Sequence, residues 1–162
     1  MDTARIEIDA PADLAYDLVA DITNMGRWSP ETYRTTWVGE PAAPVPGARF
    51  KGWNRATVYG VPTRWATTCT IRRADRGRAF SFDTPFSGAR WTYLFEPGAT
   101  HGTCTVTETR EEVATPLVTR ALYLAVGGVR RRQLAAGMHE TLHRLKEAAE
   151  AEAATTGNDV QG

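Results

Sequence analysis

The stretch Arg90-Trp91-Thr92-Tyr93-Leu94-Phe95-Glu96 places an aromatic side chain at every second position. Successive side chains of a β-strand point to opposite faces, so Trp91, Tyr93 and Phe95 share one face. Three aromatic rings on one face indicate that this face is buried. The stretch therefore predicts a strand that turns an aromatic surface toward the interior of a sheet.

The same period of two recurs on both sides of this strand. It predicts further strands at 33–38, 50–55, 64–73, 79–83 and 103–111, after a first strand that contains Ile6 and Ile8. The regular spacing of the last six strands is typical of an antiparallel meander. Strand parity places further residues on the inner face: Phe50, Gly52, Asn54, Trp65, Thr67, Cys69, Ile71, Phe80, Phe82, Cys104, Val106 and Glu108.

Helices are expected at both ends of the strand region. Two short ones follow the first strand, and Asp21 is placed to cap the second. One long helix is expected at 129–153, separated by Gly127-Gly128 from an apolar segment at 116–126. The sequence thus predicts an α+β helix-grip fold in which a seven-stranded curved antiparallel sheet surrounds a long C-terminal helix. Residues 1–153 would form a single domain, and 154–162 a disordered tail.

The long helix should cover the aromatic face of the sheet. Its apolar stripe consists of Leu134, Met138, Leu142, Leu145 and Ala149. Two arrangements are open: the rings pack solidly, or they stand around a cavity, which Gly52 and the inward threonines favour. For a cavity, the residues expected to bind a ligand are Trp28, Phe50, Asn54, Trp65, Phe82, Trp91, Met138 and Leu142.

Glu108 is the acidic group that parity places on the inner face. A buried carboxylate is costly unless it is paired, so it should meet a ligand, water or an arginine. The alternative is that it lies in solvent at a frayed strand end. The three histidines fall on a hairpin loop or the outer face of the helix, so any acid–base catalysis would fall to Glu108, with Tyr93 beside it.

Composition excludes several other classes of protein. Lysine plus arginine (19) equals aspartate plus glutamate (19) in the 162 residues, which argues against a nucleic-acid partner. Two cysteines form no disulfide framework, and the N-terminus lacks the apolar run of a signal peptide, so a cytoplasmic location is expected. Monomer and homodimer are both open. The basic run Arg130-Arg131-Arg132 indicates a solvated helix start or, as the alternative, transient membrane contact.

One short segment matches a metal-binding motif, but its place on the expected helix favours a structural explanation. His139-Glu140-Thr141-Leu142-His143 matches the H-E-x-x-H pattern of zinc metalloproteases. On the expected helix, His139 and His143 point about 100° or more away from the apolar stripe. We therefore expect both imidazoles to face solvent and no catalytic metal to be bound; a weak metal site at the surface stays open as an alternative.

Six segments together resemble the START-like superfamily, also called SRPBCC or birch-pollen-allergen-like, in its polyketide cyclase/dehydratase branch. They are Ile8-Asp-Ala-Pro-Ala-Asp-Leu-Ala-Tyr16, Met25-Gly-Arg-Trp-Ser-Pro-Glu31, Gly47-Ala-Arg-Phe-Lys-Gly52, Trp65-Ala-Thr-Thr-Cys-Thr-Ile71, Val106-Thr-Glu108 and Glu140-Thr-Leu-His-Arg-Leu-Lys146. The resemblance implies a helix-grip fold and a deep pocket for a hydrophobic small molecule. It carries no fixed catalytic motif and implies no cofactor.

Two functions follow from the residues and the resemblance. The first is a protein that binds a small hydrophobic or aromatic molecule and acts on it as a polyketide cyclase/dehydratase does. The second is a non-catalytic lipid or quinone carrier. A regulatory module whose pocket is only a core is a third alternative.

Overall fold

The computed structural model describes the backbone of residues 1–113 and 117–159 and the side chains of residues 1–113 and 132–156. In chain order the elements are β1 (Asp2–Ile8), α1 (Ala12–Ala20), the short 3₁₀ helix η1 (Ile22–Asn24), α2 (Met25–Trp28), β2 (Thr32–Trp37), β3 (Arg49–Val58), β4 (Val61–Asp75), β5 (Ala79–Thr84), β6 (Ala89–Pro97), β7 (Cys104–Glu112) and α3 (Leu117–Asp159). The predicted α+β class is confirmed.

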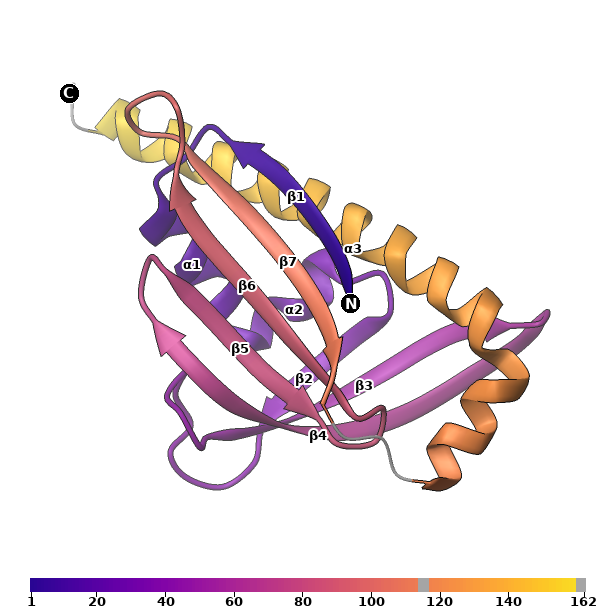
Figure 1. The fold of residues 1–162 in the computed structure, drawn as a ribbon. Helices are drawn as coiled ribbons and strands as arrows, with labels where there is room; N and C mark the ends of the chain where they lie inside the picture. The colour runs from indigo at the N-terminus through magenta and orange to yellow at the C-terminus, as the bar shows by residue number, and fades with distance from the viewer. Residues whose placement is uncertain (114–116, 160–162) are drawn as a thin grey trace.

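The sheet is a continuous antiparallel meander closed at one edge by the first strand. Its order is β1-β7-β6-β5-β4-β3-β2, and each neighbouring pair is antiparallel. The sheet curves strongly, and the long β3–β4 hairpin projects from it toward the beginning of α3 (Figure 1). The predicted seven strands and their meander are confirmed, and β1 pairs with β7.

The C-terminal helix differs from the prediction at both ends. It begins at Leu117 and runs unbroken through Gly127 and Gly128 to Asp159. Glycine lowers helix stability by about 1 kcal/mol relative to alanine, but it keeps its N–H group, so the hydrogen-bond ladder can continue. Residues 154–159, assigned to a disordered tail from the sequence, are helical. Residues 160–162 lie outside the described part of the chain.

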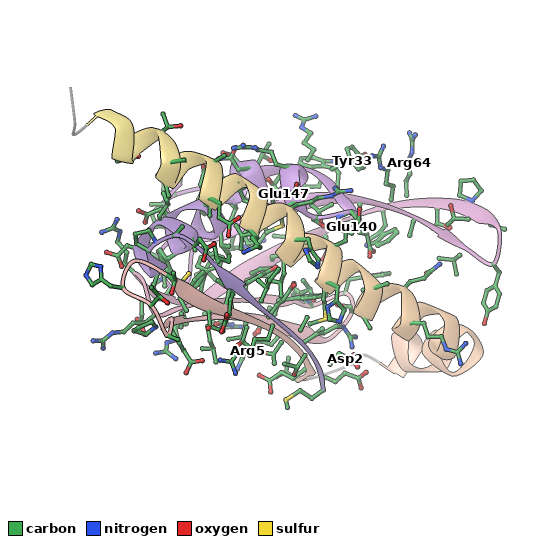
Figure 2. All side chains as sticks on the ribbon, turned by 90° about the horizontal axis from the view of Figure 1, so that it is seen from above. Asp2, Arg5, Tyr33, Arg64, Glu140 and Glu147 are labelled. Carbon is green, nitrogen blue, oxygen red and sulfur yellow. The ribbon has the colours of Figure 1, made fainter. Side chains whose placement is uncertain are left out.

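Buried side chains fix α3 against the sheet and α1. Leu142, Leu145 and Ala149 are buried in the core, as the apolar stripe predicts. Polar contacts add to this packing at two places along the helix. Gln133 Nε2 donates to the Thr57 carbonyl on the β3–β4 hairpin at 2.7 Å, and Lys146 Nζ donates to the Glu7 carbonyl on β1 at 2.8 Å. The helix therefore crosses the sheet from the hairpin to β1 (Figure 2).

The two short helices place Trp28 beside the sheet. Asp21 caps the turn of η1, as predicted, by accepting a hydrogen bond from the Thr23 N–H at 3.1 Å. At Gly26 the backbone of α2 comes so close to β2 that an added Cβ would lie 2.8 Å from the Tyr33 carbonyl oxygen. Only glycine permits this approach without a backbone shift.

Candidate functional site

A cavity of about 380 Å³ lies between the concave face of the sheet and α3. Binding sites for small molecules commonly have about 300–1,000 Å³ and mostly apolar walls. The residues around this cavity are Met25, Trp28, Ser29, Pro30, Glu31, Thr32, Phe50, Gly52, Asn54, Val58, Thr63, Trp65, Thr67, Cys69, Phe82, Thr84, Phe86, Ser87, Trp91, Tyr93, Glu108, Arg110, Leu134, Gly137, Met138 and Thr141. The alternative of a solid core is therefore excluded for this face.

Strand parity and the apolar stripe of α3 account for most of the residues beside the cavity, and their role in binding a ligand stays a prediction. The expected residues that line the cavity are Trp28, Phe50, Asn54, Trp65, Phe82, Trp91, Tyr93, Glu108 and Met138. Leu142 is the correction, because it is buried in the closed core and does not belong to the cavity wall. It follows Met138 by four positions, about 40° further around the helix, and this rotation turns it toward the core.

Glu108 and Tyr93 form the central polar pair of the wall. They lie directly opposite each other on β7 and β6, and the Tyr93 hydroxyl donates to Glu108 Oε1 at 2.7 Å. Glu108 is only 2% exposed, so the alternative of a frayed strand end in solvent is wrong. Its second oxygen, Oε2, is buried and has no hydrogen-bond partner among the described residues.

Burial changes the protonation of this pair. Removal from water raises the pKa of Glu108 to about 8, although the Tyr93 hydrogen bond opposes the shift. Burial, together with the neighbouring carboxyl group, raises the pKa of Tyr93 well above its usual value. At neutral pH both groups therefore carry protons, and Glu108 is suited to donate one as a general acid.

A second polar group lies on β3, away from Glu108. Asn54 is buried, and its Oδ1 accepts a hydrogen bond from the Thr32 hydroxyl at 2.6 Å. Strands β4, β5 and β6 separate it from Glu108 in the sheet. The cavity thus has polar groups on two separated strands with aromatic rings between them.

Trp28 and Glu31 come from the segment after α1. The sequence allows two roles for them, packing at the end of a helix or forming a lip at the mouth of the pocket. Trp28 is almost fully buried at the end of α2 and also lines the cavity. Glu31 lines the cavity as well.

Several cavity residues were missed from the sequence. Arg110 could have been found, because it follows Glu108 by two positions and therefore shares its face. Thr141 lies three positions after Met138 on α3, on the edge of the same helical face. Phe86 belongs to the β5–β6 turn, where no periodicity exists; it is 58% exposed and also borders the cavity.

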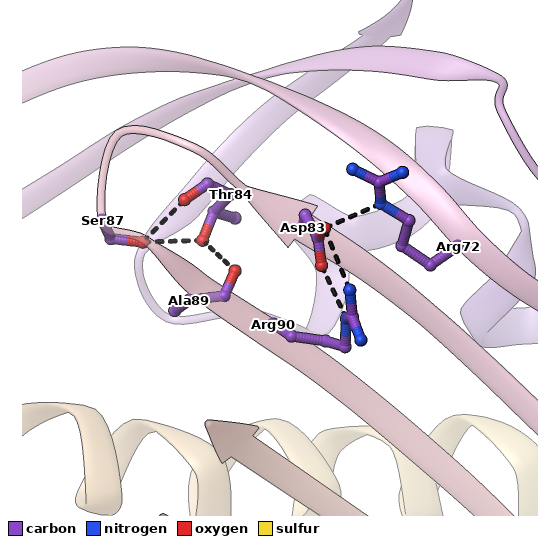
Figure 3. Close-up of polar contacts among 6 residues, drawn as sticks. All are labelled: Arg72, Asp83, Thr84, Ser87, Ala89 and Arg90. Carbon is purple, nitrogen blue, oxygen red and sulfur yellow. Dashed lines mark hydrogen bonds and ion pairs between the residues drawn. The ribbon is translucent and has the colours of Figure 1, made fainter. Parts of the chain in front are cut away.

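The β5–β6 turn holds its shape through its own hydrogen bonds (Figure 3). Thr84 Oγ1 donates to the Ala89 carbonyl at 2.9 Å and lies 2.6 Å from the Ser87 hydroxyl. On the opposite face of β5, Asp83 pairs with Arg72 and Arg90, each through a contact of 2.7 Å. The hydrogen bond from Arg90 is the main cause of the lowered pKa of Asp83. The two faces thus differ sharply: an ionised carboxylate outside and a neutral one inside.

The remaining candidate groups do not form a reactive centre. Burial raises the pKa of Cys69 to about 12, so this thiol in the cavity wall is not a thiolate at neutral pH. His139 and His143 are exposed on α3, as predicted. In the described part of the chain, no three histidine, cysteine or acidic side chains come together where they could hold a metal ion. The apolar segment before Arg130 and the arginines 130–131 have no described side chains, so the alternative of membrane contact falls outside the described residues.

No helix in the described ranges is both long enough and apolar enough to cross a membrane. Among curated proteins, none matches this chain. The chain does match solved structures. A Polyketide_cyc-like protein from Corynebacterium glutamicum is 32% identical, with a TM-score of 0.60 and coverage of 93% of this chain and 91% of that one.

Two more distant structures share the fold. A protein from Thermus thermophilus is 19% identical, with a TM-score of 0.60 and coverage of 93% and 97%. The di-domain ARO/CYC StfQ of the steffimycin biosynthetic pathway is 16% identical, with a TM-score of 0.61, and this chain covers 44% of it. The family model described as polyketide cyclase/dehydrase and lipid transport matches residues 3–150. The chain belongs to this family, and the resemblance to START-like proteins is confirmed.

Proposed function

We propose that this protein binds a small, mostly apolar or aromatic molecule in the cavity and transfers a proton to it from Glu108. The observation that carries the proposal is the buried Glu108–Tyr93 pair in the wall of an otherwise mainly apolar cavity. A carboxyl group buried in a cavity is expected to have hydrogen-bond partners or a function in binding or catalysis. Its second oxygen, Oε2, has no hydrogen-bond partner among the described residues.

The chemistry follows from the protonation of the pair. Tyr93 donates to Oε1, which leaves the acidic proton of Glu108 on Oε2. A carbonyl oxygen of a ligand that reaches Oε2 would accept this proton in a hydrogen bond. Protonation makes the carbonyl carbon more electrophilic, which favours attack by another carbon of the same molecule. This is the first requirement of a cyclisation, and the family description, polyketide cyclase/dehydrase, supports it.

The test separates binding from turnover. Native mass spectrometry of the protein purified from its own host would identify a retained ligand. Glu108→Gln keeps the shape and a hydrogen-bonding group but removes the acid. Loss of a positioned general acid typically lowers the rate 10²- to 10⁴-fold. We expect product formation to fall by that factor, while the affinity, measured by quenching of the cavity tryptophans, changes less than about tenfold, or ~1.4 kcal/mol.

A matched control is Asp83→Asn, which removes a carboxylate from the opposite face of the sheet. It should leave both turnover and affinity at the wild-type level. Equal turnover in wild type and Glu108→Gln would contradict the proposal. That result, with binding preserved, would favour the second function, a non-catalytic carrier of a lipid or quinone, for which the apolar wall alone is sufficient.

A further inference from the structure

The cavity contains a cation that the proposed proton transfer does not use. Arg110 lies two positions after Glu108 on the same face of β7, about 6.8 Å further along the strand. Its side chain is only 6% exposed. A guanidinium on a side chain this buried, in the wall of a mainly apolar cavity, is stabilised by acceptors for its five N–H groups.

The described residues satisfy this guanidinium poorly. Nη1 donates to Asp2 Oδ2 at 3.5 Å and lies 3.9 Å from Glu112 Oε1. Both contacts are longer than the 2.7–3.2 Å of a normal N–H···O hydrogen bond. Within the described ranges, Nη1 is the one nitrogen of Arg110 with a hydrogen bond or ion pair. Toward the described residues, most of the donor capacity of Arg110 is therefore unused.

Glu108 adds a second unused donor beside it. With the carboxyl group protonated, as its raised pKa indicates, Oε2 carries a proton that no described residue accepts. Tyr93 uses its own proton on Oε1. This part of the wall therefore presents hydrogen-bond donors from two neighbouring residues, which would pair with a ligand that carries hydrogen-bond acceptors.

Aromatic residues on β6 complete the patch. Trp91 lies directly opposite Arg110, as Tyr93 lies opposite Glu108. Side chains paired in this way have Cβ atoms about 4.5–5.5 Å apart. A flat ring against Trp91 would thus bring a group on its edge to the Arg110 guanidinium.

We propose that the ligand of this site is an aromatic carboxylate whose ring lies along the aromatic wall and whose carboxylate is held by Arg110 beside Glu108. The inference rests on the proposed function and names the class of molecule that the cavity takes. Arginine binds carboxylates through two parallel N–H···O bonds, which matches its unused donors. Among the described residues, a neutral ligand would leave the charge of Arg110 with its long contacts to Asp2 and Glu112.

Two probes of equal shape test this assignment by isothermal titration calorimetry. 2-Naphthoate carries the carboxylate, and 2-naphthamide is its neutral counterpart. Wild type should bind the acid at least about tenfold more tightly than the amide, a difference of ~1.4 kcal/mol. Arg110→Gln should abolish this preference and leave the affinity for the amide within about twofold, since the aromatic wall is unchanged. Arg72→Gln, a substitution on the outer face, should keep the preference in full.

A second variant covers the event that Arg110→Gln does not fold. Asp2→Asn removes a carboxylate that competes for Arg110, so it should increase the preference for the acid. Equal affinities of acid and amide in wild type, or a preference retained in Arg110→Gln, would overturn the inference and leave the proposed cavity function standing. If neither probe bound, both this inference and the proposed cavity function would be overturned.

Discussion

At the scale of the residue, Glu108 and Asp83 are two carboxyl groups whose pKa values move in opposite directions. Burial raises that of Glu108 to about 8. Hydrogen bonds from Arg90 and Arg72 lower that of Asp83. Both groups belong to one sheet, Glu108 on β7 and Asp83 on β5 with β6 between them, and they lie on opposite faces of it. The environment of each face therefore determines the charge.

This difference gives a prediction for stability against pH. Between pH 4.5 and about 8 the folded protein keeps the proton on Glu108, whereas the unfolded chain releases it. The free energy of unfolding must therefore fall as pH rises through this window. Glutamine does not titrate, so the free energy of unfolding of Glu108→Gln does not fall in this way. We therefore expect the stability of the variant, relative to wild type, to rise by a few kcal/mol from the lower to the upper end of the window. Urea denaturation at both ends measures it.

The control for this prediction is Asp83→Asn. The ion pairs of Asp83 stabilise the fold above the pKa of the unfolded aspartate, and this contribution is lost as pH falls toward acid. The variant should therefore be less stable than wild type by a constant amount across the window in which Glu108 titrates. A constant difference between Glu108→Gln and wild type would contradict the assignment of a protonated, buried Glu108.

At the scale of the element, the inner face of β3 provides a direct test of the cavity. A Cβ added at Gly52 would contact only the methyl groups of Thr32 and Thr35, at 3.6 and 3.8 Å. Gly52→Val therefore fills cavity space without a backbone clash, and valine suits a strand. We expect ligand affinity to fall at least about tenfold, or ~1.4 kcal/mol, with the melting temperature retained. Ala66→Val, at an exposed position of β4, should change neither.

The outer face of α3 gives a second prediction at this scale. His139 and His143 are one turn apart but exposed, and Glu140 between them forms an ion pair with Arg144. A catalytic zinc site needs a third protein ligand in a cleft. We expect treatment with a chelator to leave the melting temperature unchanged. Stoichiometric zinc that survives extensive dialysis would contradict this interpretation of the motif.

At the scale of the whole molecule, the contacts of α3 join segments from both ends of the chain. Lys146 and Glu150 contact the backbone of Glu7 and Asp9, and Gln133 contacts Thr57. The buried stripe of α3 belongs to the same core as the strands. The helix cannot leave without exposing that core.

We therefore predict a single cooperative unfolding transition. The far-ultraviolet circular dichroism of the helix and the near-ultraviolet signal of the tryptophans, which lie mostly on the sheet, should give one melting curve. A helix signal lost at lower temperature than the tryptophan signal would show that α3 unfolds independently.

The sequence alone determined most of the fold because its pattern is strictly local. Alternation at 90–96 and in the neighbouring strands fixes which side chains face inward, and a period of two leaves no choice of face once one face is apolar. For this reason Trp65, Phe82, Tyr93 and Glu108 could be assigned to one wall before the structure was known. The apolar stripe of α3 could be predicted in the same way from its helical spacing. The Gly127-Gly128 pair, however, suggested a break that the continuous helix does not have.

Tertiary structure alone decided which inward residues border open space and which fill the core. Met138 and Leu142 share one stripe, yet only Met138 reaches the cavity, because a small rotation about the helix axis matters only once the sheet is in place. The same holds for Glu108. Parity placed it inside, but only pairing with β6 brought the Tyr93 hydroxyl to one oxygen, while the other has no partner among the described residues. Strand register is a property of two strands and not of one.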